Sequence, residues 1–121
     1  MPGDNLLVAS SITPKVLVSA QLGTADAAVY TVAAAQSVKL ATGSLCNTTA
    51  SAVTVYVSLV QSGGAVDATH RIISGFSLAA NDTQSLTGYI DGAMLGPGDV
   101  VAAYAGTATA VAMVLTGTVH S

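Results

Sequence analysis

A two-residue alternation of side-chain type runs through this chain and is clearest over residues 52–60, AVTVYVSLV. On an extended backbone successive side chains point to opposite faces. The odd-numbered residues 53–59 are all aliphatic and share one face, whereas Thr54, Tyr56 and Ser58 share the other. β-branched and aromatic residues suit a pleated, half-buried surface. The pattern therefore predicts a central β-strand with one wall in a core.

The same alternation recurs along the chain, and helical periodicity is hard to find. Seven further strands are expected, at residues 15–22, 28–33, 37–47, 71–79, 83–90, 99–106 and 110–120. Turn residues separate them: Gly and Asn supply positive φ, and Pro97 presets a turn. About eight turn-separated strands indicate an all-β, antiparallel, jelly-roll-like β-sandwich instead of alternating βαβ units. Periodicity leaves the strand order open.

The chain has the length of one domain, because its 121 residues show no break in composition. Residues 14–121 are expected to form a single β-sandwich domain. Residues 1–13 have no clear partner pattern and are expected to form an N-terminal arm that docks on a neighbour.

Charged residues make up only 7% of the chain, against roughly 25% in typical soluble domains. A surface built from Ala, Ser, Thr, Gly and Val offers little charge repulsion between copies, which favours burial in an assembly. The alternative is a Ser/Thr-rich monomer. Since Lys15, Lys39 and Arg71 are the only basic side chains, a nucleic-acid partner is not expected. The apolar runs are too short for a membrane span.

The N-terminus has no basic segment before its short apolar run and does not resemble a secretion signal. The single cysteine, Cys46, agrees with synthesis in a reducing cytoplasm. We therefore interpret the two glycosylation sequons, at Asn47 and Asn81, as chance matches.

Few titratable side chains are available for catalysis, and we expect no enzymatic activity. Asp67, His70 and a serine suggest a triad, but no G-x-S-x-G segment accompanies them. Cys46, at the end of a predicted strand, is expected to be a buried small thiol and not a nucleophile. We interpret Asp67 and His70 as loop residues.

No cofactor is expected, because one Cys and two distant His do not make a zinc site. Calcium is harder to exclude, since four oxygen-bearing side chains occupy predicted turns that one end of a sandwich can bring together (Asn81, Asp82, Asp91, Asp99). The chain has no D-x-D-x-D-G loop, and turn formation is the simpler role for these residues.

A glycan ligand remains an alternative, because sugars stack on aromatic rings and sandwich modules often bind them. The chain has no Trp, and its aromatic residues are Tyr30, Tyr56, Phe76, Tyr89 and Tyr104. Tyr56 and Tyr104 lie in the middle of predicted strands, where they are candidates for an exposed sugar platform or an intersubunit contact.

Two segments carry a resemblance to a known family: SLCNTTASAVTVYVSLVQSGG, and FSLAANDTQSLTGYIDGAMLGPGDVVAAYAGTATAVAMVLTGTV. The pattern is a strand ending in Cys-Asn-Thr, a long Val/Thr strand, a Gly-Gly loop, a Ser-Leu-Ala-Ala segment, a Gly-Asp turn and a final alternating strand. It covers roughly residues 30–119 and resembles the small β-sandwich virion proteins of tailed bacteriophages.

This resemblance implies a non-enzymatic structural protein of the virion, made in the host cytoplasm and present in many copies. The leading role it implies is a decoration or cement protein that binds the outside of the capsid and stabilises it. Its partners would be itself, as a homotrimer, and the major capsid protein; a tail or fibre component is the alternative. The residues expected to make protein contacts are Leu6, Leu7, Val8, Ile12, Tyr56 and Tyr104.

Overall fold

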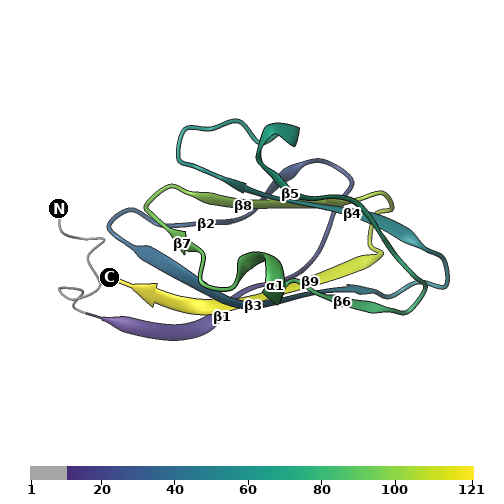
Figure 1. The fold of residues 1–121 in the computed structure, drawn as a ribbon, viewed down its shortest axis with the longest axis horizontal. Helices are drawn as coiled ribbons and strands as arrows, with labels where there is room; N and C mark the ends of the chain where they lie inside the picture. Colours follow the sequence, from purple (N-terminus) through teal and green to yellow (C-terminus); the bar gives the residue numbers. More distant parts are fainter. Residues whose placement is uncertain (1–10) are drawn as a thin grey trace.

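The computed structural model describes residues 11–121, which form two antiparallel sheets packed face to face (Figure 1). The elements are β1 (Ile12–Gln21), β2 (Ala27–Thr31), β3 (Ser37–Asn47), β4 (Val53–Val60), η3 (Ala68–His70), β5 (Arg71–Leu78), β6 (Thr83–Ser85), α1 (Thr87–Ile90), β7 (Met94–Leu95), β8 (Val100–Ala105) and β9 (Val111–His120). The all-β sandwich predicted from the alternation is confirmed.

The strands divide between two sheets that the chain visits in turn. Sheet A has the order β1-β9-β3-β6, with β7 also paired to β3, and sheet B has the order β2-β8-β4-β5. Of the links between consecutive strands, only those from β4 to β5 and from β6 to β7 stay within one sheet. Sequence neighbours therefore mostly face each other across the core instead of pairing as hairpins.

The predicted strand over residues 83–90 is wrong in its second half. Only β6 is extended; α1 follows as a single helical turn, and β7 then returns to β3. The turn brings Leu86 and Ile90, both buried, against the position of Gly43 in β3. A Cβ at Gly43 would lie 2.9 Å from Ile90 Cδ1 and 3.0 Å from Leu86 Cβ. The glycine thus provides the space that the two side chains fill.

The first strand begins inside the segment expected to be an arm. Ile12 pairs with His120 and Thr13 with Val119, so both belong to β1. Leu6, Leu7 and Val8 lie outside the described residues.

The core contains the aliphatic face predicted for the central strand. Val53, Val55 and Val57 are buried, and Leu59 packs against them half-buried. The facing strands β3 and β9 of sheet A contribute further large buried side chains (Leu40, Leu45, Met113, Leu115), and β5, the neighbour of β4 in sheet B, contributes Leu78. Fully burying each such side chain stabilises the fold by roughly 1.5–3 kcal/mol before entropy is counted. The inward rows of the two sheets therefore fix which face of every strand is left outside.

Asn47 holds one end of the sandwich together from a fully buried position. Its Nδ2 donates to the carbonyls of Ser51, Leu78 and Ala79 at 2.8, 3.1 and 3.2 Å. Its Oδ1 accepts from the backbone N–H and the hydroxyl of Thr49 at 3.0 and 2.8 Å. The amide therefore supports the turn after β3 and joins it to the end of β5. In the folded protein the sequon at this position has no exposed amide to modify.

Gly117 should not tolerate a side chain, because a Cβ there would overlap the backbone carbonyl oxygen of Lys39. We expect Gly117→Ala to lower the free energy of unfolding by about 2 kcal/mol or more, since backbone must move to relieve the overlap. Gly23→Ala is the matched control, because no atom lies within 4 Å of its added Cβ, and its effect should stay within about 0.5 kcal/mol. Urea unfolding of both variants checks this; equal effects would contradict it.

Candidate functional site

Tyr56 and Tyr104 lie side by side on the outer face of sheet B. They are direct partners in the β4–β8 pairing, and their rings stack with centroids 4.3 Å apart and planes inclined by 7°. Both side chains are half-buried. Each ring therefore covers one face of the other, and the pair is not the open double platform that a sugar would need.

Arg71, the first residue of β5, lies against this pair. Its Cζ is 5.5 Å from the centroid of the Tyr56 ring and 5.3 Å from that of Tyr104. Because the two distances are nearly equal, the guanidinium lies alongside the stack and not on its outer end. At these distances the guanidinium is within cation–π range of both rings.

An ion pair fixes the guanidinium in place. Arg71 Nη1 donates to Asp26 Oδ2 at 2.8 Å and to Ser58 Oγ at 2.9 Å. The hydrogen bond to Asp26 raises the pKa of Arg71 above its ordinary value. Arg71 Nε and Asp26 Oδ1 are buried without a protein partner. We call Asp26, Tyr56, Ser58, Arg71 and Tyr104 the tyrosine–arginine cluster; it joins the loop before β2 to three strands of sheet B.

The Asp67–His70 pair is a loop feature, as expected. Asp67 Oδ1 accepts from the Thr69 N–H at 2.9 Å and caps the turn η3. These hydrogen bonds to Thr69 lower the pKa of Asp67. In residues 11–121 no hydrogen bond joins His70 to a serine, so the triad suggested by the sequence is not assembled there.

Cys46 lies half-buried in β3, between Thr83 of β6 and Ala112 of β9. Its neighbours Leu45 and Asn47 point into the core, so Cys46 points to the outer face of sheet A. The expectation that Cys46 is buried in the core is wrong. Side chains alternate between the two faces of β3, and Leu45 and Asn47 are the ones that point inward.

The turn carboxylates do not converge. Asp99 Oδ1 accepts from the Ser62 N–H at 2.9 Å and Oδ2 from the Gly96 N–H at 2.8 Å, while Asp82 Oδ1 accepts from the Thr83 N–H. Among the described residues no three acidic, His or Cys side chains group as metal ligands. The turn-forming role expected as the simpler alternative is the one that these hydrogen bonds show.

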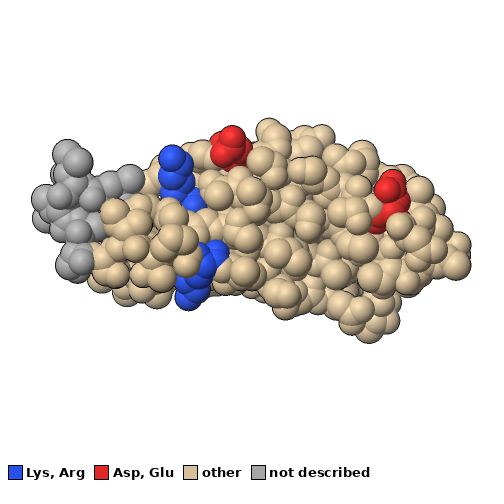
Figure 2. Space-filling view, turned by 90° about the horizontal axis from the view of Figure 1, so that it is seen from below, with Lys and Arg blue, Asp and Glu red and all other residues tan. Residues whose placement is uncertain are grey.

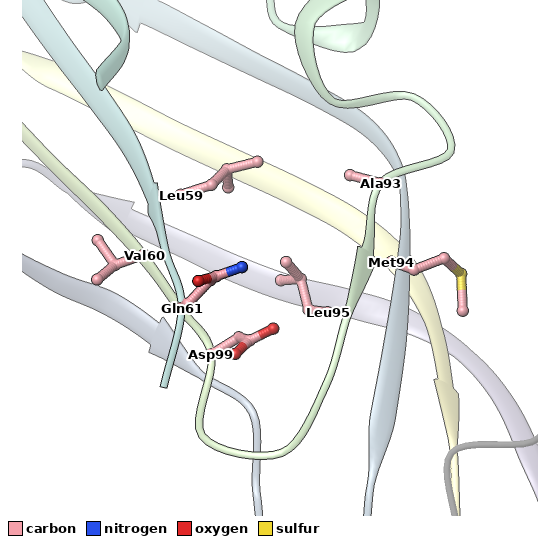
Figure 3. Close-up of a pocket in the computed structure, with 7 residues that line it drawn as sticks. All are labelled: Leu59, Val60, Gln61, Ala93, Met94, Leu95 and Asp99. Carbon is pink, nitrogen blue, oxygen red and sulfur yellow. The ribbon is translucent and has the colours of Figure 1, made fainter. Parts of the chain in front are cut away.

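A small pocket of about 210 Å³ opens between the end of β4 and β7 (Figure 3). Asp99 is its one acidic lining residue, and both of its oxygens are already held by backbone N–H groups. The remaining lining is largely aliphatic (Leu59, Val60, Gln61, Ala93, Met94, Leu95). The Gln61 amide is therefore the only polar side-chain group of the lining that these backbone N–H groups do not hold.

The outer face of sheet A carries few charged side chains (Figure 2). Its two central rows follow from the strand register: Val16, Thr116 and Thr42 form one, and Ser19, Val114, Ser44 and Ser85 form the next. We call this surface the A face. Its exposed apolar side chains include Val16, which is 55% exposed, and Met94, which is 48% exposed.

The few charges of the A face lie at its ends. Lys39 points outward beside Thr118, at the end near the described termini, and Figure 2 shows basic side chains gathered there. A shallow cavity of about 460 Å³ at this end brings together Lys39, Asp91 and the 96%-buried His120, whose Nδ1 has no partner. Asp82 lies at the opposite end, next to the β6–β3 pairing.

Ile12 is the one candidate contact residue of the N-terminal segment that the structure describes. It is 57% exposed at the margin of the A face. The structure thus separates the predicted contacts: Ile12 belongs to sheet A, whereas Tyr56 and Tyr104 belong to the outer face of sheet B. No helix in residues 11–121 is long and apolar enough to cross a membrane.

Comparison with protein-family models, with curated proteins and with solved structures finds no match for this chain.

Sequence reasoning missed Arg71 and Asp26. They are 45 residues apart in the chain, and only the fold brings them together. Arg71 lies beside Ser58 because of the register between β4 and β5. Knowing that register would have revealed the cluster, but the alternation of side chains does not determine which strands pair or in which register.

The Arg71–Asp26 pair should contribute measurably to stability. In a double-mutant cycle with Arg71→Met and Asp26→Asn, we expect a coupling of about 1 kcal/mol, because both side chains are mostly buried and hydrogen-bonded. Lys39→Met with Asp91→Asn is the control, since these residues share a cavity without forming an ion pair. Urea denaturation measures both cycles. Equal couplings would show that the guanidinium–carboxylate contact has no special role.

Proposed function

We propose that this protein is a non-enzymatic structural component of a tailed-phage particle, and that it decorates the outside of the capsid. The observation that carries the proposal is the nearly uncharged A face of the sandwich. A surface of short aliphatic and hydroxyl side chains can approach another protein closely, because it has few charges to desolvate. The family resemblance in residues 30–119 supports assigning that partner to the virion.

The strand order supports a jelly-roll assignment. β6 and β7 pair with different stretches of β3, around residues 44–46 and 38–39, and so act as one interrupted edge strand. Each sheet then has four strand positions. We therefore infer a jelly-roll-like double sheet, an architecture found in viral capsid and lectin domains. The fold is compatible with a virion role without selecting it over a sugar-binding one.

The mode of action would be adhesion. Each copy buries a modest area against the capsid protein or another copy, and repetition over a symmetric shell converts weak contacts into a stable layer. The core and the buried Asn47 amide hold the two sheets together, so that each copy presents the same outer faces. A tail or fibre location uses the same physics with fewer copies.

The glycan-binding alternative rests on Tyr56 and Tyr104. Their rings are engaged with each other and with Arg71, which leaves less aromatic surface for a sugar than two separate rings would offer. We therefore rank adhesion to protein above sugar binding.

Quantitative mass spectrometry of purified particles of the encoding phage tests the proposal. A decoration protein should be present at a copy number comparable to that of the major capsid protein, because it repeats with the capsid lattice. A copy number far below that of the capsid protein would move the protein to the tail. Its absence from washed particles, with the capsid protein present as internal control, would overturn a structural role.

A further inference from the structure

We propose that the A face binds the A face of a second copy around a two-fold axis that lies in the contact plane and runs across the strands. This inference deepens the proposed function, on which it rests for its biological meaning, by naming a partner and a surface. It replaces the threefold arrangement that the family resemblance implies with a two-fold contact.

The first argument is the chemistry of the surface. The two central rows of the A face consist of Val, Ser and Thr side chains, and their outward neighbours on β9 are Ala112 and Thr118. The β9 members are half-buried already within one chain. Such rows can pack against a copy of themselves without desolvating a charge, and two flat sheets packed face to face are a stable arrangement.

The second argument is area. Sheet A is four strands wide, and its long strands have about ten residues. At roughly 4.8 Å between strands and 3.3 Å per residue, such a face covers about 600 Å². Two faces together would bury about 1,200 Å², the lower end of the range for specific stable interfaces. Interfaces of this size are often weak or transient, and the repetition of copies on a particle would strengthen such an association.

The third argument is charge, and it selects the axis. Lys39 shares one end of the face with Lys15 and Asp91, which leaves that end net positive. Asp82 lies at the other end, roughly 20 Å away from Lys39 along β3. An axis parallel to the strands would place Lys39 opposite Lys39 of the second copy. An axis across the strands places each Lys39 opposite the other copy's Asp82, so that two attractive pairs frame the uncharged centre.

Sedimentation equilibrium of the purified full chain tests the contact without any phage particle. We expect a monomer–dimer equilibrium that Val114→Arg weakens by about a hundredfold or more, because the substitution buries two unpaired guanidinium groups at the centre of the contact. Thr31→Arg is the matched control: it adds the same exposed charge on sheet B, and dimerisation should be unchanged. Thermal unfolding confirms that both variants are folded.

Charge exchange tests the axis. Lys39→Asp alone and Asp82→Lys alone should each weaken the dimer by about threefold to tenfold, and the double variant should recover it, since each end then pairs in the opposite sense. A monomeric or trimeric wild type, or a dimer insensitive to Val114→Arg, would overturn the proposed contact. Failure of the double variant to recover dimerisation would overturn the axis. Either result leaves the copy-number test of the proposed function unaffected.

Discussion

The packing of two sheets through aliphatic side chains at every second position is the constraint on which the rest of this structure depends. The chain crosses from one sheet to the other at most of its connections. Most turns must therefore place the aliphatic side chains of the next strand on the inner face of its sheet. A one-residue slip would exchange the buried and exposed rows. The buried Asn47 amide, bonded to the end of β5, and the close backbone approach at Gly117 each fit only the observed register.

Alternation predicted the extended segments well where β-branched residues are dense, as in β4 and β9, because there local preference and core packing agree. It failed over residues 86–90, where Leu86 and Ile90 are buried by a helical turn instead of a strand. Both residues have the same parity in an extended chain, so the pattern alone could not separate the two conformations. The space at Gly43 that decides between them is contributed by a strand some forty residues earlier.

The candidate contact residues show the same limit. The sequence shows that Tyr56 and Tyr104 lie in the middle of strands, but their stacking depends on the β4–β8 register. Arg71 comes to lie beside them, and Asp26 beside Arg71, only once sheet B is assembled. The outer face of sheet B is thus filled by contacts among the chain's own side chains, whereas the outer face of sheet A is left almost without charge. Because of this difference between two sheets of similar size, we propose sheet A as the surface that binds other molecules.

The stacked tyrosines have one more consequence. The chain lacks Trp, so its four tyrosines dominate its near-ultraviolet spectrum, and two of them are held 4.3 Å apart with nearly parallel rings. Chromophores so close and so rigid couple to each other, and their circular dichroism reports on the geometry of sheet B alone. The circular dichroism of this pair therefore monitors the fold from the face opposite to the A face. Association of copies through the A face should leave that signal unchanged.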